Sequence, residues 1–302
     1  MTLINIKRIK GSYMGKKQLC LSVEGGGALG IGPLAFMCRM EQDFGKKISE
    51  LVTAYTGTST GAIIIACLAE GMSAHEVFDL YRNNLKKIFT KYPWYKRVKP
   101  TCPTYDNSNL KELLEKNLPG KVSDWTKPVY ITSTFMNGES VEKVWDLGDR
   151  DTDKWFAVLS STAAPTYFDV LERNGESYMD GGCWANCPAD IVIAGQFKQG
   201  NKDLKLLNFN TGMKTPNTEH GNQTLLGWAE YMLSDWVARS SQSPIYEAEA
   251  ILGKENVFNA SPSYKKKIKM DDVSDKNVEK IIDIWEKYYE SVKDELKDFM
   301  KR

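Results

Sequence analysis

At two places near the start of the sequence, a short apolar run leads directly into glycines and then into a helical pattern. The first run is Gln18 to Val23, and the helical pattern that follows it covers Leu34 to Met40. The second run is Val52 to Thr56, followed by the apolar helical pattern of Gly61 to Glu70. Short apolar runs bounded by glycine are typical of buried strands. Strand, glycine turn and helix, repeated in this order, predict a parallel sheet covered by helices on both faces.

The rest of the chain adds further elements to this pattern. Ser73 and Glu76 form a capping-box sequence, which predicts a helix from Ala74 to about Lys87. The stretch Tyr92 to Tyr105 has three prolines among aromatic and basic residues, which is typical of a surface loop; a substrate rim and an ordinary packed loop both fit it. Apolar periodicity predicts three more strands and two more helices, at Val129 to Phe135, Val141 to Trp145, Lys205 to Phe209, Asp153 to Thr162 and Pro188 to Phe197.

A long amphipathic pattern occupies the C-terminal end, at about residues 277–300. Its opposite face mixes both charge signs, which favours a helix packed on the core over a membrane-surface helix. The apolar residues at helical spacing are Val278, Ile281, Ile282, Trp285, Tyr288, Val292, Leu296 and Phe299. Because no repeat or linker divides the chain, we expect residues 18–302 to form a single domain, preceded by a basic, flexible tail at residues 1–17.

Composition and charge narrow the class of protein. With 42% hydrophobic and 26% charged residues, the chain has the composition of a soluble globular protein. Lys plus Arg (40) nearly balances Asp plus Glu (39), so we expect no nucleic-acid binding and only local electrostatic attraction to other surfaces. The local basic clusters that stand out are Lys7, Arg8, Lys10, Lys16 and Lys17, and Lys265, Lys266, Lys267 and Lys269, and both fit solvated surface charge.

No segment predicts a metal site, an export signal or a membrane span. The six cysteines include no CxxC pair and no histidines at zinc spacing, so reduced thiols are expected. The segment Met1 to Lys17 lacks an apolar core, and the longest apolar stretch, Ala62 to Ala69, is far shorter than the roughly 20 residues that a spanning helix needs. We therefore expect a cytoplasmic protein with transient, peripheral membrane association.

The pentapeptide Gly57-Thr58-Ser59-Thr60-Gly61 matches the G-x-S-x-G pattern of a nucleophilic serine. It lies between a predicted strand and a predicted helix, where a tight turn exposes the hydroxyl and the positive end of the helix favours negative charge on its oxygen. Taken alone, the pentapeptide also fits a glycine-rich turn with an inert serine.

A second glycine-rich segment, Gly25 to Gly30 (GGGALG), follows the first predicted strand. Consecutive glycines allow backbone N–H groups to converge on an anion, either a phosphate or the oxyanion of an acyl-transfer intermediate. The segment lacks the G-x-G-x-x-G dinucleotide signature and a Walker lysine, which argues against a nucleotide site. Together with a nucleophilic serine, it predicts an oxyanion hole.

A nucleophilic serine needs a proton acceptor, and the chain has only two histidines. His75 falls within the predicted capped helix; His220 lies in a polar stretch and fits only a Ser–Asp–His order. Their scarcity favours a carboxylate, and the best placed is Asp180, at the end of a predicted strand and followed by Gly181 and Gly182. A β-hairpin turn also fits this Asp-Gly pair. Because the usual aspartate pKa of about 3.9 makes a weak base, the predicted site must be partly desolvated.

Taken together, these motifs resemble the patatin-like phospholipase family. The segment LLNFNTG at Leu206 to Gly212 is similar to the strand and turn that follow in the family. Two positions depart from the usual pattern: Glu24 stands where the family often has Asp, and Leu29 where many members have a basic residue. The four matching pieces occur in the family's order: EGGGALG at Glu24 to Gly30, GTSTG at Gly57 to Gly61, SSTAAPTYF at Ser160 to Phe168 and DGGCWANCPA at Asp180 to Ala189.

The resemblance implies a three-layer α/β/α fold with a mainly parallel central sheet, and phospholipase A or lysophospholipase activity without metal or cofactor. It assigns Ser59 as the nucleophile and Asp180 as its base. It also assigns the oxyanion donors and the glycines that support the motifs, which are Gly25, Gly26 and Gly27, and Gly30, Gly57, Gly61, Gly181 and Gly182. The implied partner is a phospholipid or lysophospholipid. An acyltransferase that uses the same acyl-enzyme and a catalytically silent lipid-binding relative remain the alternatives.

Overall fold

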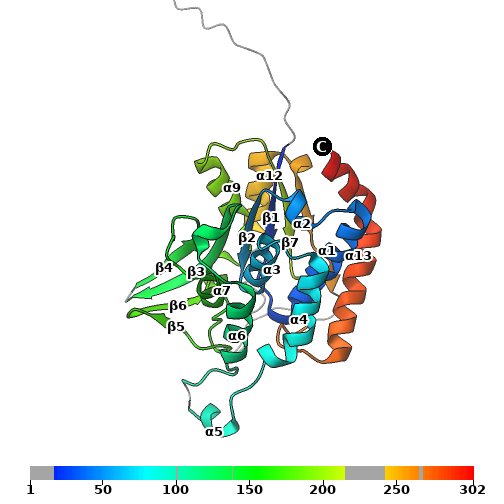
Figure 1. Ribbon diagram of the computed structural model, residues 1–302. Coiled ribbons are helices and arrows are strands. Elements are labelled where there is room, and N and C mark those ends of the chain that lie inside the picture. Colours follow the sequence, from blue (N-terminus) through cyan, green and yellow to red (C-terminus); the bar gives the residue numbers. More distant parts are fainter. Residues whose placement is uncertain (1–16, 100, 138, 215–241, 265–267) are drawn as a thin grey trace, which may run out of the picture.

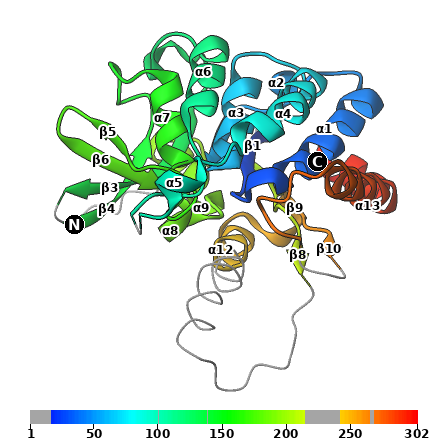
Figure 2. The ribbon, with the colours of Figure 1, turned by 90° about the horizontal axis from the view of Figure 1, so that it is seen from below.

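The computed structural model describes residues 17–99, 101–137, 139–214, 242–264 and 268–302. In this part of the chain, an eight-stranded sheet lies between two layers of helices (Figures 1 and 2), which confirms the expected three-layer α/β/α fold. The strand order is β5-β6-β3-β2-β1-β7-β9, with β4 also paired to β3. The strands are β1 (Gln18–Val23), β2 (Ala54–Thr58), β3 (Val129–Asn137), β4 (Glu139–Trp145), β5 (Leu171–Arg173), β6 (Glu176–Asp180), β7 (Leu204–Phe209) and β9 (Val257–Ala260). A separate parallel pair joins β8 (Met213–Lys214) to β10 (Ser263–Tyr264).

The middle of the sheet is parallel and one edge is antiparallel. Strand β1 pairs in parallel with β2 and β7, and β2 pairs in parallel with β3. The register of β1 and β2 sets Val23 opposite Gly57, so the two glycine segments leave the sheet side by side. Strand β6 runs antiparallel to β3, with Asp180 opposite Ser133, one residue beyond the Thr132 that pairs with Thr58. Asp180 therefore ends its strand at the level where β2 enters its turn.

Helices cover the two faces of the sheet unequally. Figure 2 shows α1, α3, α4, α7 and α13 on one side and α8, α9 and α12 on the other, each side over its own apolar core. The helices of eight or more residues are α1 (Ile31–Phe44), α3 (Thr60–Ala69), α4 (Ala74–Ile88), α6 (Ser108–Asn117), α7 (Lys154–Ser161), α9 (Ala189–Lys198), α12 (Ser243–Leu252) and α13 (Asp275–Lys301). The shorter ones include α2 (Ile48–Leu51), α5 (Trp94–Arg97), α8 (Gly182–Ala185), and the 3-10 turns η1 (Gly27–Gly30), η2 (Val122–Asp124) and η4 (Lys254–Asn256).

The clearest sequence patterns form the expected elements. The capping box of α4 is present, because the Ser73 N–H donates to Glu76 Oε2 (2.7 Å) and the Glu76 N–H donates to Ser73 Oγ (3.2 Å). The apolar stripe of α13 packs on the core, with Trp285 fully buried, which confirms core packing over a membrane-surface role for this helix. Some boundaries differ from the prediction: Val52 caps α2, β2 covers Ala54–Thr58, and α1 extends over Ile31–Phe44.

Some expectations fall outside the described residues: the tail residues 1–16, His220, and Lys265, Lys266 and Lys267. Lys17 is described, and its Nζ donates to Asn256 Oδ1 (2.7 Å). None of the helices in the described ranges combines the length and the apolar character needed to span a bilayer.

Candidate active site

Ser59 occupies a strained turn between β2 and α3. Its backbone has φ 54° and ψ −122°, a conformation that costs a non-glycine residue roughly 1–3 kcal/mol. Two contacts hold it there: its N–H donates to Ser161 Oγ (2.8 Å), and its carbonyl accepts from the Ala62 N–H (2.9 Å) in the first turn of α3. The turn thus presents the serine at the N-terminal end of a buried helix, where partial positive charge favours an anion.

Close packing around the turn requires glycine. A Cβ added at Gly61 would lie 2.0 Å from the Val23 carbonyl oxygen, so no side chain fits between β1 and α3 at this point. At Gly182 the contact is milder, 3.0 Å from Asp180 Oδ1. The predicted support positions at which an added Cβ would come within 2.8 Å of a neighbouring atom are Gly30, Gly57, Gly61 and Gly181.

Asp180 meets Ser59 although the two residues lie far apart in the sequence. Its side chain is 4% exposed and accepts hydrogen bonds from the Ser59 hydroxyl and from the Gly182 N–H (2.7 Å to Oδ1). Burial raises the pKa of Asp180 from its ordinary value of 3.8 to about 6, while the two hydrogen bonds act in the opposite direction. The desolvation that the sequence called for is therefore present, and it makes this carboxylate a stronger base.

The structure brings no described histidine to the serine. His75 lies on the exposed side of α4, where its Nδ1 is 3.2 Å from Asp79 Oδ2. A surface pair of this kind is an ordinary helix i,i+4 contact. Asp180 is thus the titratable group that hydrogen-bonds to Ser59 in the described part of the chain.

The glycine segment lies next to Ser59, but its three amides differ. A Cβ added at Gly25 would lie 3.2 Å from the Ser59 Cβ. The Gly25 N–H donates to the Asn186 carbonyl oxygen (3.2 Å), so this predicted donor already has an acceptor. The N–H groups of Gly26 and Gly27 have no acceptor among the residues that the structure describes. The expectation of three donors therefore narrows to these two, which remain candidates.

Carbonyl anchors fix the orientation of this glycine segment. The Tyr81 hydroxyl donates to the Gly27 carbonyl (2.7 Å), and Thr211 Oγ1 donates to the Gly25 carbonyl (2.9 Å). Gly27 has φ +55°, and a Cβ there would lie 2.5 Å from the Met270 carbonyl oxygen, so this position needs glycine. These carbonyls are bound, whereas the Gly26 and Gly27 amides have no acceptor in the described part of the chain and can serve an anion.

The side chain of Glu24 is buried and hydrogen-bonded to the neighbouring strand β7. It is 2% exposed, and its Oε1 accepts from Asn208 Nδ2 (3.0 Å) on β7. The departure from the family pattern at this position therefore concerns a buried carboxylate that links the end of β1 to β7.

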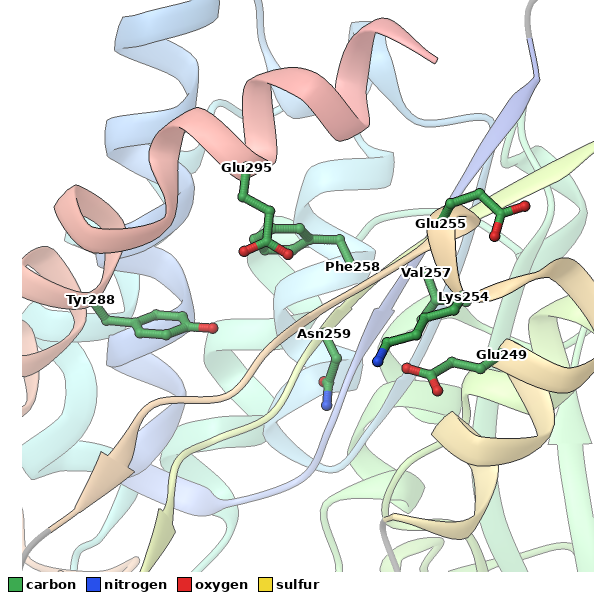
Figure 3. A pocket seen from close by; sticks show the side chains of 8 residues that line it. All are labelled: Glu249, Lys254, Glu255, Val257, Phe258, Asn259, Tyr288 and Glu295. Carbon is green, nitrogen blue, oxygen red and sulfur yellow. The ribbon is translucent and has the colours of Figure 1, made fainter.

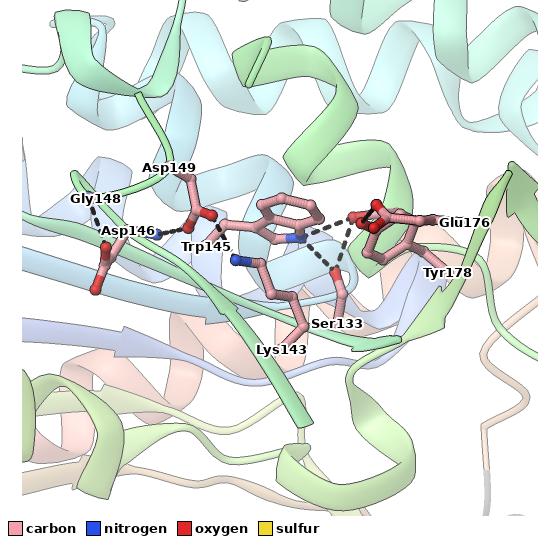
Figure 4. A network of polar contacts seen from close by, with 9 residues as sticks. Ser133, Lys143, Trp145, Asp146, Gly148, Asp149, Glu176 and Tyr178 are labelled. Atoms are coloured by element: carbon pink, nitrogen blue, oxygen red, sulfur yellow. Dashed lines mark hydrogen bonds and ion pairs between the residues drawn. The ribbon is translucent and has the colours of Figure 1, made fainter. Parts of the chain in front are cut away.

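A buried polar network supports the serine and the aspartate from behind. Trp145 Nε1 donates to Ser133 Oγ and to Ser160 Oγ (both 3.0 Å), and the two serine hydroxyls are 2.8 Å apart; Figure 4 shows Trp145 and Ser133 in this network. Ser133 lies opposite Asp180 in the sheet, and Ser160 precedes the Ser161 that binds the Ser59 backbone. The network thus ties both functional candidates to β3 and α7.

The sequence reasoning did not identify Asn186, Ser161 or Tyr81 as supporting residues. Asn186 and Ser161 lie inside segments that carry the family resemblance, so their position in those motifs was the available signal. Tyr81 had none, because its contact with Gly27 joins an ordinary helix to a loop far away in sequence.

A cavity of about 550 Å³ lies at the far edge of the sheet, between α12, β9 and α13 (Figure 3). Its lining is mixed acidic, aromatic and polar, and includes neither Ser59 nor Asp180. We assign no catalytic role to this cavity.

Replacing Ser59 tests the backbone strain. We expect Ser59→Gly to be more stable than Ser59→Ala by about 1 kcal/mol, because glycine adopts positive φ without the steric cost. Both variants lack the hydroxyl, so the difference between their free energies of unfolding reports the backbone strain. Urea unfolding measures this difference. Equal stability of the two variants would contradict strain at this turn.

Replacing Asp180 tests its burial. Because its folded pKa lies above the unfolded value, the folded state holds its proton more tightly, and stability is lost as the pH rises from about 4 through 6. Well above pH 6, Asp180→Asn should therefore unfold with a free energy higher than wild type by up to about 3 kcal/mol. Below the unfolded pKa the difference should disappear. Thermal unfolding against pH measures this, and a destabilised Asn variant at high pH refutes it.

Comparisons with known proteins identify relatives of similar sequence. A cGAMP-activated phospholipase of Escherichia coli strain TW11681 is 28% identical over 220 residues, covering 63% of this chain and 61% of the relative. An intracellular phospholipase A2 of Caenorhabditis elegans is 26% identical over 214 residues, covering 66% of this chain and 19% of the relative. The chain thus spans about three fifths of the first relative's length and one fifth of the second's.

Among solved structures, VipD from Legionella pneumophila aligns with a TM-score of 0.45 and 14% identity, covering 92% of this chain and 67% of that protein. A family model described as patatin-like phospholipase matches residues 21–193. This match takes in more than half of the 302 residues and contains the strained serine, the glycine segment and the buried aspartate. The chain belongs to the patatin-like phospholipase family.

Proposed function

We propose that this protein hydrolyses the fatty-acyl esters of phospholipids or lysophospholipids, with Ser59 as nucleophile and Asp180 as base. The observation that carries the proposal is the hydrogen bond from the Ser59 hydroxyl to a buried carboxylate of raised pKa. The names of the two relatives, a cGAMP-activated phospholipase and an intracellular phospholipase A2, support a lipid ester as the substrate class.

The first half of the reaction makes an acyl-enzyme. Ser59 Oγ attacks the ester carbonyl carbon while its proton passes to the Asp180 carboxylate. The carbonyl oxygen gains the negative charge. The amides of Gly26 and Gly27, which have no acceptor among the described residues, are the donors available to it, each of the kind that contributes a factor of about 10² to 10³ in rate. The intermediate then expels the alcohol part of the lipid, which takes the proton from Asp180.

The second half releases the fatty acid. Asp180, again ionised, accepts a proton from water as the water oxygen attacks the acyl carbon. Collapse of the second intermediate breaks the bond to Ser59 Oγ, which recovers the proton from Asp180. One carboxylate thus serves as base and acid in each half, a role that suits a pKa of about 6 better than the ordinary aspartate value.

Acyl transfer to another acceptor and a silent lipid-binding role are the competing functions. An acyltransferase would form the same acyl-enzyme and transfer its acyl group to an alcohol or lysolipid. Product analysis with and without such acceptors separates transfer from hydrolysis. A silent relative would leave Ser59 unlabelled by a fluorophosphonate, whereas the proposed enzyme reacts covalently at that residue.

Substitution of either partner tests the proposed function. Ser59→Ala and Asp180→Asn should each lower turnover of a short-chain p-nitrophenyl ester by a factor of about 10³ or more, because the nucleophile or its proton acceptor is lost. His75→Gln, an exposed position on α4, is the matched control and should keep wild-type turnover. Near-wild-type turnover of either active-site variant would sink the proposal.

The raised pKa predicts the pH profile. Since only ionised Asp180 accepts the proton, kcat/KM for a soluble ester should fall about tenfold per pH unit below about pH 6 and level off above it. The residual activity of Asp180→Asn should lack this step. A profile whose inflection lies near the ordinary aspartate pKa, or one unchanged by Asp180→Asn, contradicts the assignment.

A further inference from the structure

The segment Lys91–Lys99, which contains α5 and is here called the α5 loop, projects from one end of the molecule (Figure 1). Its apolar side chains point into solvent: Trp94 is 74% exposed, Tyr95 58% and Val98 70%. Large apolar residues gathered on one exposed segment mark an interaction surface, whereas single exposed residues are ordinary. The loop therefore needs a partner that accepts aromatic and aliphatic groups.

The charge of the same segment is entirely positive. Between Lys86 and Tyr105 the sequence has no acidic residue, and its basic residues are Lys86, Lys87, Lys91, Lys96, Arg97 and Lys99. Within the described ranges, ion pairing in this group is confined to Lys86, which pairs with Asp275. Arg97 Nε donates to the Tyr92 carbonyl (2.8 Å), and Lys96 Nζ lies 5.1 Å from the centre of the Tyr92 ring, so neither contact is with an acidic group. The loop thus offers a positive surface to an anionic partner.

The base of the loop, where Lys91 pairs with Tyr105 in an antiparallel bridge, is hydrogen-bonded to two other segments of the chain. The Tyr92 hydroxyl donates to Asp169 Oδ2 (2.6 Å), in the segment that leads through β5 and β6 to Asp180. The Tyr105 hydroxyl donates to Asp271 Oδ2 (2.8 Å), next to the Met270 whose carbonyl holds the end of the glycine segment. The base of the loop is therefore attached both to the segment that leads to Asp180 and to the segment that contacts the end of the glycine segment.

The views place the loop at the active-site end. Strand β1 begins near the top of Figure 1, so its carboxyl end and the glycine segment point to the lower end, where α5 projects. Figure 2 looks onto that end, with α5 toward the viewer. Trp184 of α8, four residues after Asp180, is also 36% exposed. A flat partner that meets the α5 loop therefore also faces the end of the sheet at which β1 leads into the glycine segment.

We propose that the α5 loop binds the surface of an anionic phospholipid bilayer and holds the active-site end of the protein against it. Trp and Tyr favour the headgroup level of a bilayer, where their apolar rings and polar atoms are both satisfied. Lys and Arg interleaved with them are attracted to anionic headgroups. The inference rests on the proposed function, because it supplies the lipid substrate to Ser59 at an interface.

The side-chain geometry favours a bilayer over single-stranded nucleic acid. The Trp94 and Tyr95 rings meet edge to face, with centroids 6.2 Å apart at 84°, so they form no parallel platform for stacked bases. Val98 adds an aliphatic group that inserts among acyl chains and has no partner in a base stack. Binding to an oligonucleotide is accordingly the contrary outcome in the test.

The test measures binding without catalysis. The full chain carrying Ser59→Ala is sedimented with vesicles of phosphatidylcholine alone or of phosphatidylcholine mixed with phosphatidylglycerol. Two variants are added in that background, an apolar one and a charge one: Trp94→Ala/Tyr95→Ala/Val98→Ala, and Lys96→Gln/Arg97→Gln/Lys99→Gln. The matched control is Tyr246→Ala/Ile251→Ala on α12, where the residues are 75% and 54% exposed but have acidic neighbours, Glu247 and Glu249. Thermal unfolding checks that each variant is folded.

The proposal expects selective loss. The background protein should prefer the phosphatidylglycerol vesicles, both α5 variants should bind them about tenfold more weakly, and the control should be unchanged. High salt should abolish the difference between the charge variant and its background. When the same α5 substitutions are made in protein that keeps Ser59, hydrolysis of phospholipid in vesicles should fall about tenfold relative to hydrolysis of the soluble ester. As a second measurement, quenching of tryptophan fluorescence by brominated lipid should decrease in Trp94→Phe.

Three results would overturn the proposal: unchanged vesicle binding in both α5 variants, an equal loss in the α12 control, or α5-dependent binding of an oligonucleotide with no vesicle binding. Failure of the proposed function looks different. In that case Ser59→Ala leaves ester turnover intact, while the sedimentation result stands independently.

Discussion

The parallel pairing of β1 with β2 is the constraint on which the candidate site depends. It sets Val23 opposite Gly57, so the glycine segment and the serine turn leave the sheet side by side at the carboxyl ends of these two strands. The contact is tight enough that Gly61 accommodates no side chain against the Val23 carbonyl. A shift of this register by one residue would turn the side chains of either strand to the opposite face and separate the serine from the amides beside it.

Two energetically unfavourable features at this end of the sheet are offset by the surrounding structure. Ser59 has an unfavourable backbone conformation, and Asp180 is held in a desolvated position that opposes its charge. Helix α3, which begins at the serine, is almost entirely apolar and buried between β1, β2 and α7, and its burial stabilises the turn. Strain and desolvation concentrated at one point, and supported by a rigid core, are features of functional sites in general.

Much of this arrangement was predictable because it rests on local patterns. The strand-glycine-helix repeats, the capping box at Ser73 and the apolar stripe that includes Trp285 each occupy a short window of sequence. Strands β5 and β9 have only three or four residues and no clear alternation, so their sequences carried little signal. The acceptor of the Gly25 amide was out of reach for another reason: it is the carbonyl of Asn186, and a backbone contact between distant segments leaves no trace in either side chain.

The distribution of charge on the surface was also only partly predictable from the sequence. The near balance of acidic and basic residues correctly describes the net charge of +1, but attraction at a surface depends on charges within about 10 Å, the screening length at moderate salt. Sequence clusters drew attention to the N-terminal tail and to the lysines around Lys266, whereas the basic residues of the α5 loop are interrupted by Tyr92, Pro93 and Trp94 and form no obvious run. The sequence indicates a surface loop here, and the fold adds that Trp94, Tyr95 and Val98 are exposed on it and that it projects from one end of the molecule. The basic residues of the α5 loop form no continuous run because aromatic residues separate them. The same separation places aromatic and basic groups next to one another, as binding at a membrane interface requires.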